Sequence, residues 1–420
     1  MKKNPKLFLT IFFFGTAYAL QYALPFIQYV LYNPLVATLN VTNAQLGVLI
    51  AIFGIGNIVG APIGGWFADR FSYKTIYIIS MFGTSALSFL FAFNLNYQFA
   101  VYIWIGLAVT ALFAFYPSHI KAVRMLGDEE SQGKIFGLSE SASGIGSVIV
   151  NSLALFLFGR ATTEALGLQA AIIGYGVASL VVGIVLYFLM ESPAENKNVD
   201  EDAEESISLK DYWIVLKFPG TWLAGMAIFV TYTLYTTLTY FTPYFTDVLG
   251  VTVAFSGGLA IVRTYLLRFV GAPIGGYIGD KIHSVTKVLG ISFLASAIII
   301  LAFLGLPATT STTIIIILTL LISTFTFMAR GNMFAVPAEV KSPTKYAAMT
   351  AGITCAIGFA PDLFQFTMYG SWLDKYGNDG YRYIFIYAVA ILIIGIINSI
   401  LTLMYKKHQA KQESQEVTVK

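Results

Sequence analysis

The stretch GAPIGGWFADRFSYKT, which begins at Gly60, has a second copy in GAPIGGYIGDKIHSVTK, which begins at Gly271. The copies share their first six residues, and each continues to an acid followed directly by a base, Asp69-Arg70 and Asp280-Lys281. Each copy ends a long apolar run, which predicts a glycine-faced helix that leaves a membrane in a short charged turn. The offset of 211 residues, about half of the chain, indicates two related halves.

The composition is that of a membrane protein. Of 420 residues, 57% are hydrophobic and 11% are charged, whereas soluble domains have about 25% charged residues. Apolar segments of about 20 residues recur along the chain, and each is long enough to cross about 30 Å of hydrocarbon as a helix. The sequence therefore predicts an all-α polytopic fold with about twelve transmembrane helices in two six-helix bundles. We place these spans at 7–32, 44–68, 76–95, 98–119, 136–158, 169–190, 218–246, 253–279, 288–306, 313–337, 346–371 and 381–404.

Basic residues indicate the orientation of these spans. With a cytoplasmic N-terminus, most Lys and Arg of the short loops fall inside, and the outside carries only Arg160, Lys375 and Arg382. By the positive-inside rule, both termini and the central loop are expected in the cytoplasm. We expect an N-terminal bundle at 1–190 and a C-terminal bundle at 218–405. The acidic linker at 191–217 is expected to include an interfacial helix with Trp213, and the polar tail at 406–420 is expected to fray.

The sequence also argues against several function classes. Cys355 is the sole cysteine, and His119, His283 and His408 are widely separated, so neither a disulfide nor a metal site is expected. No phosphate-binding loop of the form G-x-x-x-x-G-K-[ST] occurs, so we expect a gradient rather than ATP to supply energy. We predict no cofactor, no metal, no nucleic-acid partner, no enzymatic activity and a monomeric state.

The repeated motif carries a resemblance to a known family. Five residues resemble the signature that follows the second helix of the major facilitator superfamily: Gly64, Gly65, Asp69, Arg70 and Lys74. A weaker second copy consists of Gly275, Gly276, Asp280, Lys281 and Lys287. The chain departs from the signature at Phe71 and Ser72, where the family usually has a glycine and a base. The resemblance extends over the whole chain in helix count, loop charge and repeat spacing.

The resemblance implies a cytoplasmic gate that holds the outward-open state. It assigns gating roles to Gly65, Asp69, Arg70, Lys74, Asp280 and Lys281. Small residues permit close helix approach, and charges at a helix end bond free backbone groups, so the chemistry is compatible. Glu140 is expected to pair with Arg124 or Arg70 near this gate. Two later stretches, KAVRMLGDEESQGKIFGLSE from Lys121 and PDLFQFTMYGSWLD from Pro361, resemble a bacterial branch of poorly characterised inner-membrane permeases, some linked to sugar acids or sulfo-sugars.

Two polar aromatic stripes are candidates for a substrate cavity. The first span carries Tyr18, Gln21 and Tyr22 on one helical face, and the seventh span carries Tyr232, Tyr235 and Thr236. The corresponding helices line the central cavity in the family, so the resemblance implies substrate contacts for these residues. The alternative is interhelical packing with locally satisfied hydroxyl groups.

Four ionisable residues are candidates for positions deep within the predicted spans: Arg263, Arg268, Arg330 and Asp362. Arg268 precedes Asp280 by twelve residues, which places it about 18 Å from the cytoplasmic helix end, near mid-membrane. Arg263 is turned about 140° from Arg268 around the helix. One interpretation is that its side chain snorkels outward to the membrane surface. The excess of arginine favours an anionic substrate bound by Arg268 and Arg330. An Arg268-Asp362 or Arg330-Asp362 structural ion pair is the alternative.

Two further residues complete the candidate site. Asn57 aligns with Arg268 at the offset of 211 residues, so it is expected either to contact the same ligand or to pack between helices. Asp362 is the proton-coupling candidate, because burial raises the proton affinity of a carboxylate unless an arginine holds it ionised. Organophosphate exchangers of the superfamily have arginines on helices 1 and 7, which this chain lacks. Oxalate-type exchangers have bases on helices 8 and 11, where this chain has Arg268 and Asp362.

The sequence therefore predicts a secondary transporter of a small organic anion in a bacterial inner membrane, with either proton symport or anion exchange. A carboxylate or an acidic sugar derivative is the preferred substrate. Export of apolar drugs is the alternative transport function. A transporter-like sensor or a polytopic membrane enzyme is the alternative of a different class.

Overall fold

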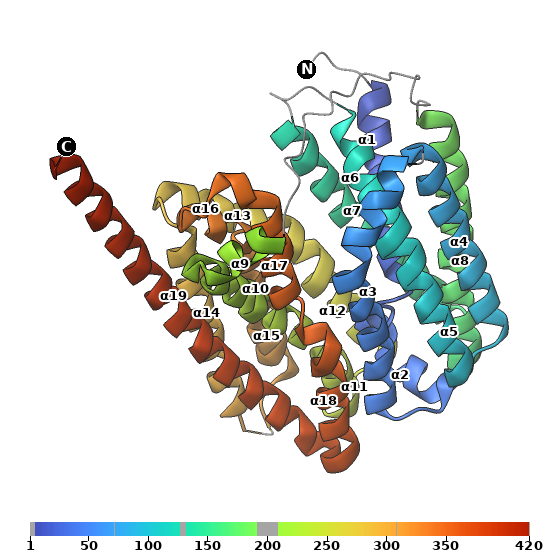
Figure 1. The fold of residues 1–420 in the computed structure, drawn as a ribbon. Helices are drawn as coiled ribbons and strands as arrows, with labels where there is room; N and C mark the ends of the chain where they lie inside the picture. Colours follow the sequence, from blue (N-terminus) through green and yellow to red (C-terminus); the bar gives the residue numbers. More distant parts are fainter. Residues whose placement is uncertain (1–4, 71, 127–131, 191–208, 308, 420) are drawn as a thin grey trace. The chain divides into compact units, whose positions relative to one another are not determined.

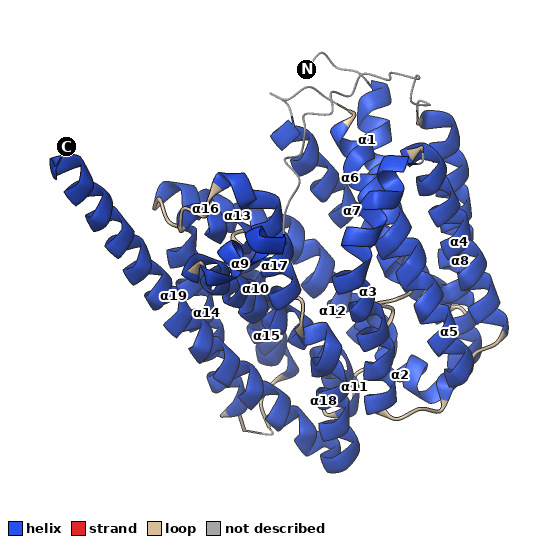
Figure 2. Cartoon of the chain, viewed as in Figure 1, coloured by secondary structure: helices blue, strands red, loops and turns tan. Residues whose placement is uncertain are grey.

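The computed structural model describes residues 1–420 except 1–4, 71, 127–131, 191–208, 308 and 420 (Figure 1). The described residues form helices joined by turns and loops, with no strand among them (Figure 2). This confirms the all-α fold predicted from the sequence.

Nine helical stretches of the described residues are long and apolar enough to cross a membrane. One of them, Met349–Gln412, contains the last predicted span and all but the first residues of the span before it. The second predicted span is represented by the shorter apolar helix Asn43–Gly56. The seventh corresponds to α10 and α11, which flank a short 3₁₀ turn, so the helices follow the spans predicted from the apolar runs.

Contacts divide the chain into two units, which do not coincide with the two halves of the sequence. The first consists of residues 1–197, 239–269 and 362–380, and the second of residues 198–238, 270–361 and 381–420. The bounds of the two predicted six-helix bundles remain a prediction.

The first unit contains most of the helices of the N-terminal half. These are α1 (Pro5–Ala23), α2 (Gln28–Leu39), α3 (Asn43–Arg70), α4 (Tyr73–Phe93), α5 (Tyr97–Ala108), η1 (Val109–Phe115), α6 (Tyr116–Arg124), α7 (Gln132–Gly159) and α8 (Glu164–Leu189). Its later elements are η3 (Leu238–Tyr240, from Thr239), α11 (Phe241–Asp247), α12 (Val253–Ile261), η4 (Val262–Leu266), the start of α13 (Leu267–Lys281), α18 (Pro361–Tyr376, from Asp362) and η7 (Gly377–Asp379).

The second unit contains the remaining elements. These are α9 (Leu209–Lys217), α10 (Pro219–Thr237), the rest of α13, α14 (Val285–Leu304), α15 (Thr312–Arg330), η5 (Met333–Ala335), α16 (Val336–Glu339), η6 (Thr344–Tyr346), α17 (Ala347–Gly358) and α19 (Gly380–Val419, from Tyr381). The helix predicted around Trp213 is present as α9, and the Trp213 side chain is exposed.

The second copy of the repeated motif brings α13 close to α15. Gly271, Gly275 and Gly279 recur every four residues and share one face of α13. A Cβ atom at Gly275 would lie 2.3 Å from the backbone oxygen of Met328 on α15, so only glycine fits this contact. The glycines therefore permit the close helix approach that the motif predicted.

The C-terminal helix is longer than predicted. The sequence placed the end of the last span at residue 404 and predicted a frayed tail, whereas α19 continues to Val419. The prediction of a frayed tail is therefore wrong. Lys, Gln, Glu and Ala favour helix even without apolar packing, which explains the continuation.

Candidate functional site

The α1 stripe meets an aromatic cluster in the first unit. The Tyr18 ring lies 4.8 Å from that of Tyr22 and 5.4 Å from the His119 ring, centroid to centroid. His119 on α6 is buried, stacks on Phe115 and shares a hydrogen bond of 3.2 Å with the Tyr77 hydroxyl. Tyr18 and Tyr22 stay partly exposed at the edge of this cluster. The structure thus joins two of the three stripe residues, Tyr18 and Tyr22, to a histidine that the sequence did not single out.

Gln21, the third member of that stripe, is buried. Its Nε2 donates to the Met81 sulfur at 3.3 Å, and its Oε1 accepts from the Thr84 hydroxyl at 2.7 Å. Both partners belong to α4, so the amide holds α1 against α4. This is the contact that the packing alternative predicted, and a substrate role for Gln21 stays a prediction.

Arg268 pairs with Glu140, an acid that sequence analysis expected to pair with other arginines. Its Nη2 lies 2.6 Å from Oε2 of Glu140 on α7. The sequence suggested Arg124 or Arg70 as the partner of Glu140, and Asp362 as a partner of Arg268. The protein does not enclose this pair, since 21% of the Arg268 side chain and 61% of the Glu140 side chain are exposed.

Arg263 does not snorkel outward. Its relative exposure is 0%, and its Nη2 donates to the Thr242 hydroxyl at 2.8 Å. The interpretation as an outward-snorkelling residue is therefore wrong. The span formed by α12, η4 and α13 turns through the π-helical segment η4 at this point, which changes the direction in which the side chain leaves the helix.

Asp362 is buried in the first turn of α18, with 1% of its surface exposed. It packs on Gly54 of α3, where a Cβ atom would lie 2.6 Å from the Cβ of Asp362. About three turns further along α18, Asp374 accepts hydrogen bonds from the backbone N–H groups of Asn43 and Ala44 at the start of α3, at 2.8 and 2.9 Å. The carboxylate of Asp374 thereby caps a helix of the opposite half of the sequence.

In the second unit, Arg330 lies against the α10 stripe. Its guanidinium carbon is 4.2 Å from the Tyr235 ring centroid and 5.9 Å from that of Tyr232. Nη1 of Arg330 is buried and has no hydrogen-bond partner among the described residues. Thr236 donates its hydroxyl hydrogen bond to its own helix, at Tyr232 O or Thr233 O, each 3.0 Å away. The structure therefore brings together three of the predicted substrate residues, Arg330, Tyr232 and Tyr235.

The predicted gate is only partly described. Asn57, Gly65, Asp69 and Arg70 lie on α3, but their side-chain surroundings are outside the described part of the structure. Lys74 donates to the backbone oxygen of Met190 at 2.6 Å, at the C-terminal end of α8, where a cation is stabilised by the helix dipole. Asp280, Lys281 and Arg124 are exposed. Their gating roles stay predictions.

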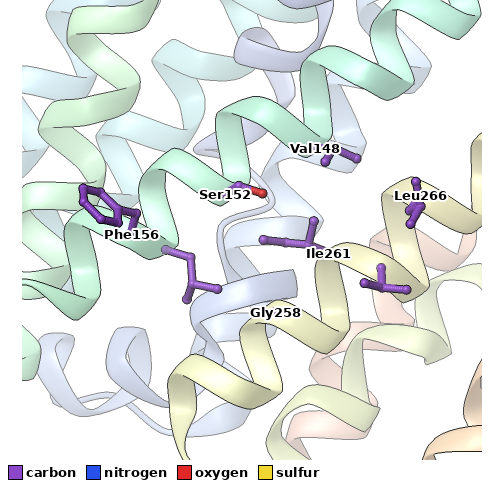
Figure 3. Close-up of a pocket in the computed structure, with 8 residues that line it drawn as sticks. Val148, Ser152, Phe156, Gly258, Ile261 and Leu266 are labelled. Atoms are coloured by element: carbon purple, nitrogen blue, oxygen red, sulfur yellow. The ribbon is translucent and has the colours of Figure 1, made fainter.

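A groove of about 430 Å³ lies in the first unit, but its walls do not suit an anion (Figure 3). It runs between α7 and the segment formed by α12 and η4. Its lining is Val148, Ser152, Leu155, Phe156, Gly258, Ile261, Val262 and Leu266. The lining contains one hydroxyl group and no charged side chain, so the cationic contacts described above are the better candidates for an anion.

His119 and Tyr77 are the main residues that sequence analysis missed. Both fall on apolar-rich spans without a motif around them, and neither shares a helix with the α1 stripe. A histidine inside a span was the only available signal, because ionisable groups are costly there.

Comparisons with known proteins agree with this architecture. The chain is 28% identical over 379 residues to the inner membrane protein YqcE of Escherichia coli K12, covering 89% of each chain. It is 28% identical over 396 residues to the inner membrane protein YihN of the same organism, covering 93% of this chain and 94% of YihN. The hexuronate transporter of Bacillus subtilis is 24% identical over 312 residues, covering 70% of this chain and 69% of that protein.

A solved structure shows the same fold. A bacterial homologue of the human lysosomal transporter Spinster, in an inward-facing and unoccupied conformation, matches with a TM-score of 0.77 at 16% identity, covering 97% of this chain and 98% of that chain. The family profile of the Major Facilitator Superfamily matches residues 7–361. Together with the repeated motif and the helical fold, this match shows that the chain belongs to the Major Facilitator Superfamily.

Proposed function

We propose that this transporter moves a small organic anion, preferably a sugar acid or a related carboxylate, across a bacterial inner membrane by alternating access. The observation that carries the proposal is the environment of Arg330. Its guanidinium lies on Tyr235 and near Tyr232, and no carboxylate pairs with it among the described residues.

This environment suits a ligand that is anionic at one end and carries hydroxyl groups at the other. The Arg330 side chain is partly buried, and a charge withdrawn from water without a counter-charge is costly, so a ligand carboxylate that completes the balance is bound favourably. Guanidinium groups bond carboxylate oxygens well, and tyrosine rings offer an apolar face with a polar edge for the rest of the ligand. The name of the hexuronate transporter relative points to the same substrate class.

The other predicted residues keep proposed roles in this transport. Substrate contacts are proposed for Arg268, Asn57, Tyr18, Gln21, Tyr22, Tyr232, Tyr235 and Thr236. Asp362 is proposed to couple transport to protons, with anion exchange as the other mode of energy supply. The charged turns after the repeated motif are proposed to act as the cytoplasmic gate, in a monomer with both termini in the cytoplasm.

The test is thermal stabilisation of the purified protein by sugar acids, dicarboxylates, neutral sugars and lipophilic cations, since a ligand of the folded state raises Tm. We expect stabilisation by an acid class. Arg330→Met should weaken its binding about 10- to 100-fold, as expected for the loss of charged hydrogen bonds. Arg382→Met, which removes an exposed arginine of α19, is the matched control and should bind like wild type.

Other outcomes would decide against transport of an anion. Stabilisation by lipophilic cations with Arg330→Met unaffected would favour drug export. Binding of an acid without uptake into proteoliposomes would favour a sensor.

A further inference from the structure

We propose that Arg263 is a second anion-binding residue, which binds the carboxylate of an anion of the transported class within the first unit. The proposal rests on the anionic substrate proposed above and adds a residue for which sequence analysis predicted no substrate contact.

Arg263 is the largest charged side chain in the described interior of the first unit, and no counter-charge there balances it. Its exposure is 0%, and only Nη2 is engaged, in the bond to Thr242. Nε and Nη1 are buried and have no hydrogen-bond partner among the described residues. These two nitrogens carry most of the N–H donors of the guanidinium, so its bonding capacity is largely unused.

The surroundings orient the guanidinium without neutralising it. The Thr242 hydroxyl donates to the backbone oxygen of Tyr29 at 2.9 Å, which leaves its lone pair to accept from Arg263. The Phe241 ring centroid lies 5.6 Å from the guanidinium carbon. Neither neighbour is an acid, and no ion pair of Arg263 occurs among the described residues. An arginine held in one orientation with donors to spare is what a carboxylate site requires.

The helix itself is altered at this residue. Arg263 belongs to η4, a π-helical turn inside an otherwise α-helical span. Such turns are rare and are frequent at functional sites, because the strained ladder is retained only where its geometry is needed. The groove drawn in Figure 3 is lined by Val262 and Leu266 of the same turn but not by Arg263, so the arginine does not serve that groove.

A purely structural role for Arg263 predicts a different stability for the variant that lacks it. If Arg263 held the fold together, its removal would lower stability, as the loss of a bonded buried charge does. If it is retained for a ligand, its unpaired charge destabilises the empty protein, and an apolar side chain of similar length is tolerated or stabilising. The Tm of the ligand-free variant and its response to ligand therefore separate the two roles.

The experiment compares wild type, Arg263→Met, Arg330→Met and Arg382→Met as purified full-length proteins. D-glucuronate, D-galactonate and D-gluconate are the probes, and Tm is measured with and without each probe. We expect ligand-free Arg263→Met to melt no lower than wild type and to bind the active probe at least about tenfold more weakly. Arg382→Met should match wild type in both measurements.

The variants distinguish the failure of one proposal from the failure of both. A lowered ligand-free Tm with the probe shift retained in Arg263→Met would show a structural arginine and overturn the inference, while loss of the shift in Arg330→Met alone would leave the proposed function standing. If no probe shifts wild type, both proposals in their sugar-acid form fail. Arg263→Lys keeps the charge but not the planar fork, and an unchanged KM for uptake in that variant would also overturn the inference.

Discussion

Arg268 and Glu140 form an ion pair that the protein does not enclose. Glu140 is bonded to the guanidinium that is proposed to bind an anion, so we expect it to compete with the substrate. Glu140→Gln should therefore lower the apparent Kd for the anion about two- to fivefold and change the free energy of unfolding by less than about 1 kcal/mol, as for exposed pairs. Titration of Tm with the anion measures the first effect, and urea unfolding measures the second.

Glu164→Gln is the control at this scale, because Glu164 is another exposed glutamate, at the start of α8. It should leave the Kd unchanged. Weaker binding in Glu140→Gln alone would mean that Glu140 holds Arg268 in its binding orientation rather than competing for it.

At the scale of elements, the contact between α13 and α15 depends on adjacent glycines in very different surroundings. A Cβ atom at Gly275 would lie 2.3 Å from Met328 O, whereas a Cβ atom at Gly276 would have nothing within 4 Å. Gly275→Leu should destabilise the protein by about 1–3 kcal/mol or more through overpacking. Gly276→Leu changes the same residue type in the same helix and should be neutral. Melting curves of the detergent-solubilised proteins make the comparison. Equal Tm values for the two variants would show that α13 and α15 can move apart without loss of stability.

At the scale of the whole molecule, Asp362 is the buried acid through which a proton gradient is proposed to act. Asp362→Asn cannot ionise, so it should lose uphill accumulation of the anion in proteoliposomes with an imposed pH gradient. It should retain exchange of labelled for unlabelled anion, because exchange needs no net proton movement. Asp379→Asn, at an exposed acid of η7, should retain both activities. Full accumulation by Asp362→Asn would remove Asp362 from the coupling mechanism.

The class of protein and most of its helices followed from local sequence. A chain in hydrocarbon must satisfy its backbone within each span, so apolar runs of sufficient length predict helices with few alternatives. The repeated glycine motif predicted a close helix contact, and the structure places Gly271, Gly275 and Gly279 on one face of α13, with Gly275 against Met328 of α15. The end of α19 was missed because its polar residues favour helix without an apolar signal.

The partners of the ionisable residues were decided only in the tertiary structure. The sequence placed Arg263 and Arg268 about 140° apart on a regular helix, but the π-helical turn between them alters that relation, and burial of Arg263 depends on Thr242 and Tyr29 from two other helices. Glu140 meets Arg268, and His119 meets Tyr77, across separations of 128 and 42 residues. Periodicity gives the face of a helix, whereas the rotation of that face toward a particular neighbour is set by the packing of all the helices at once.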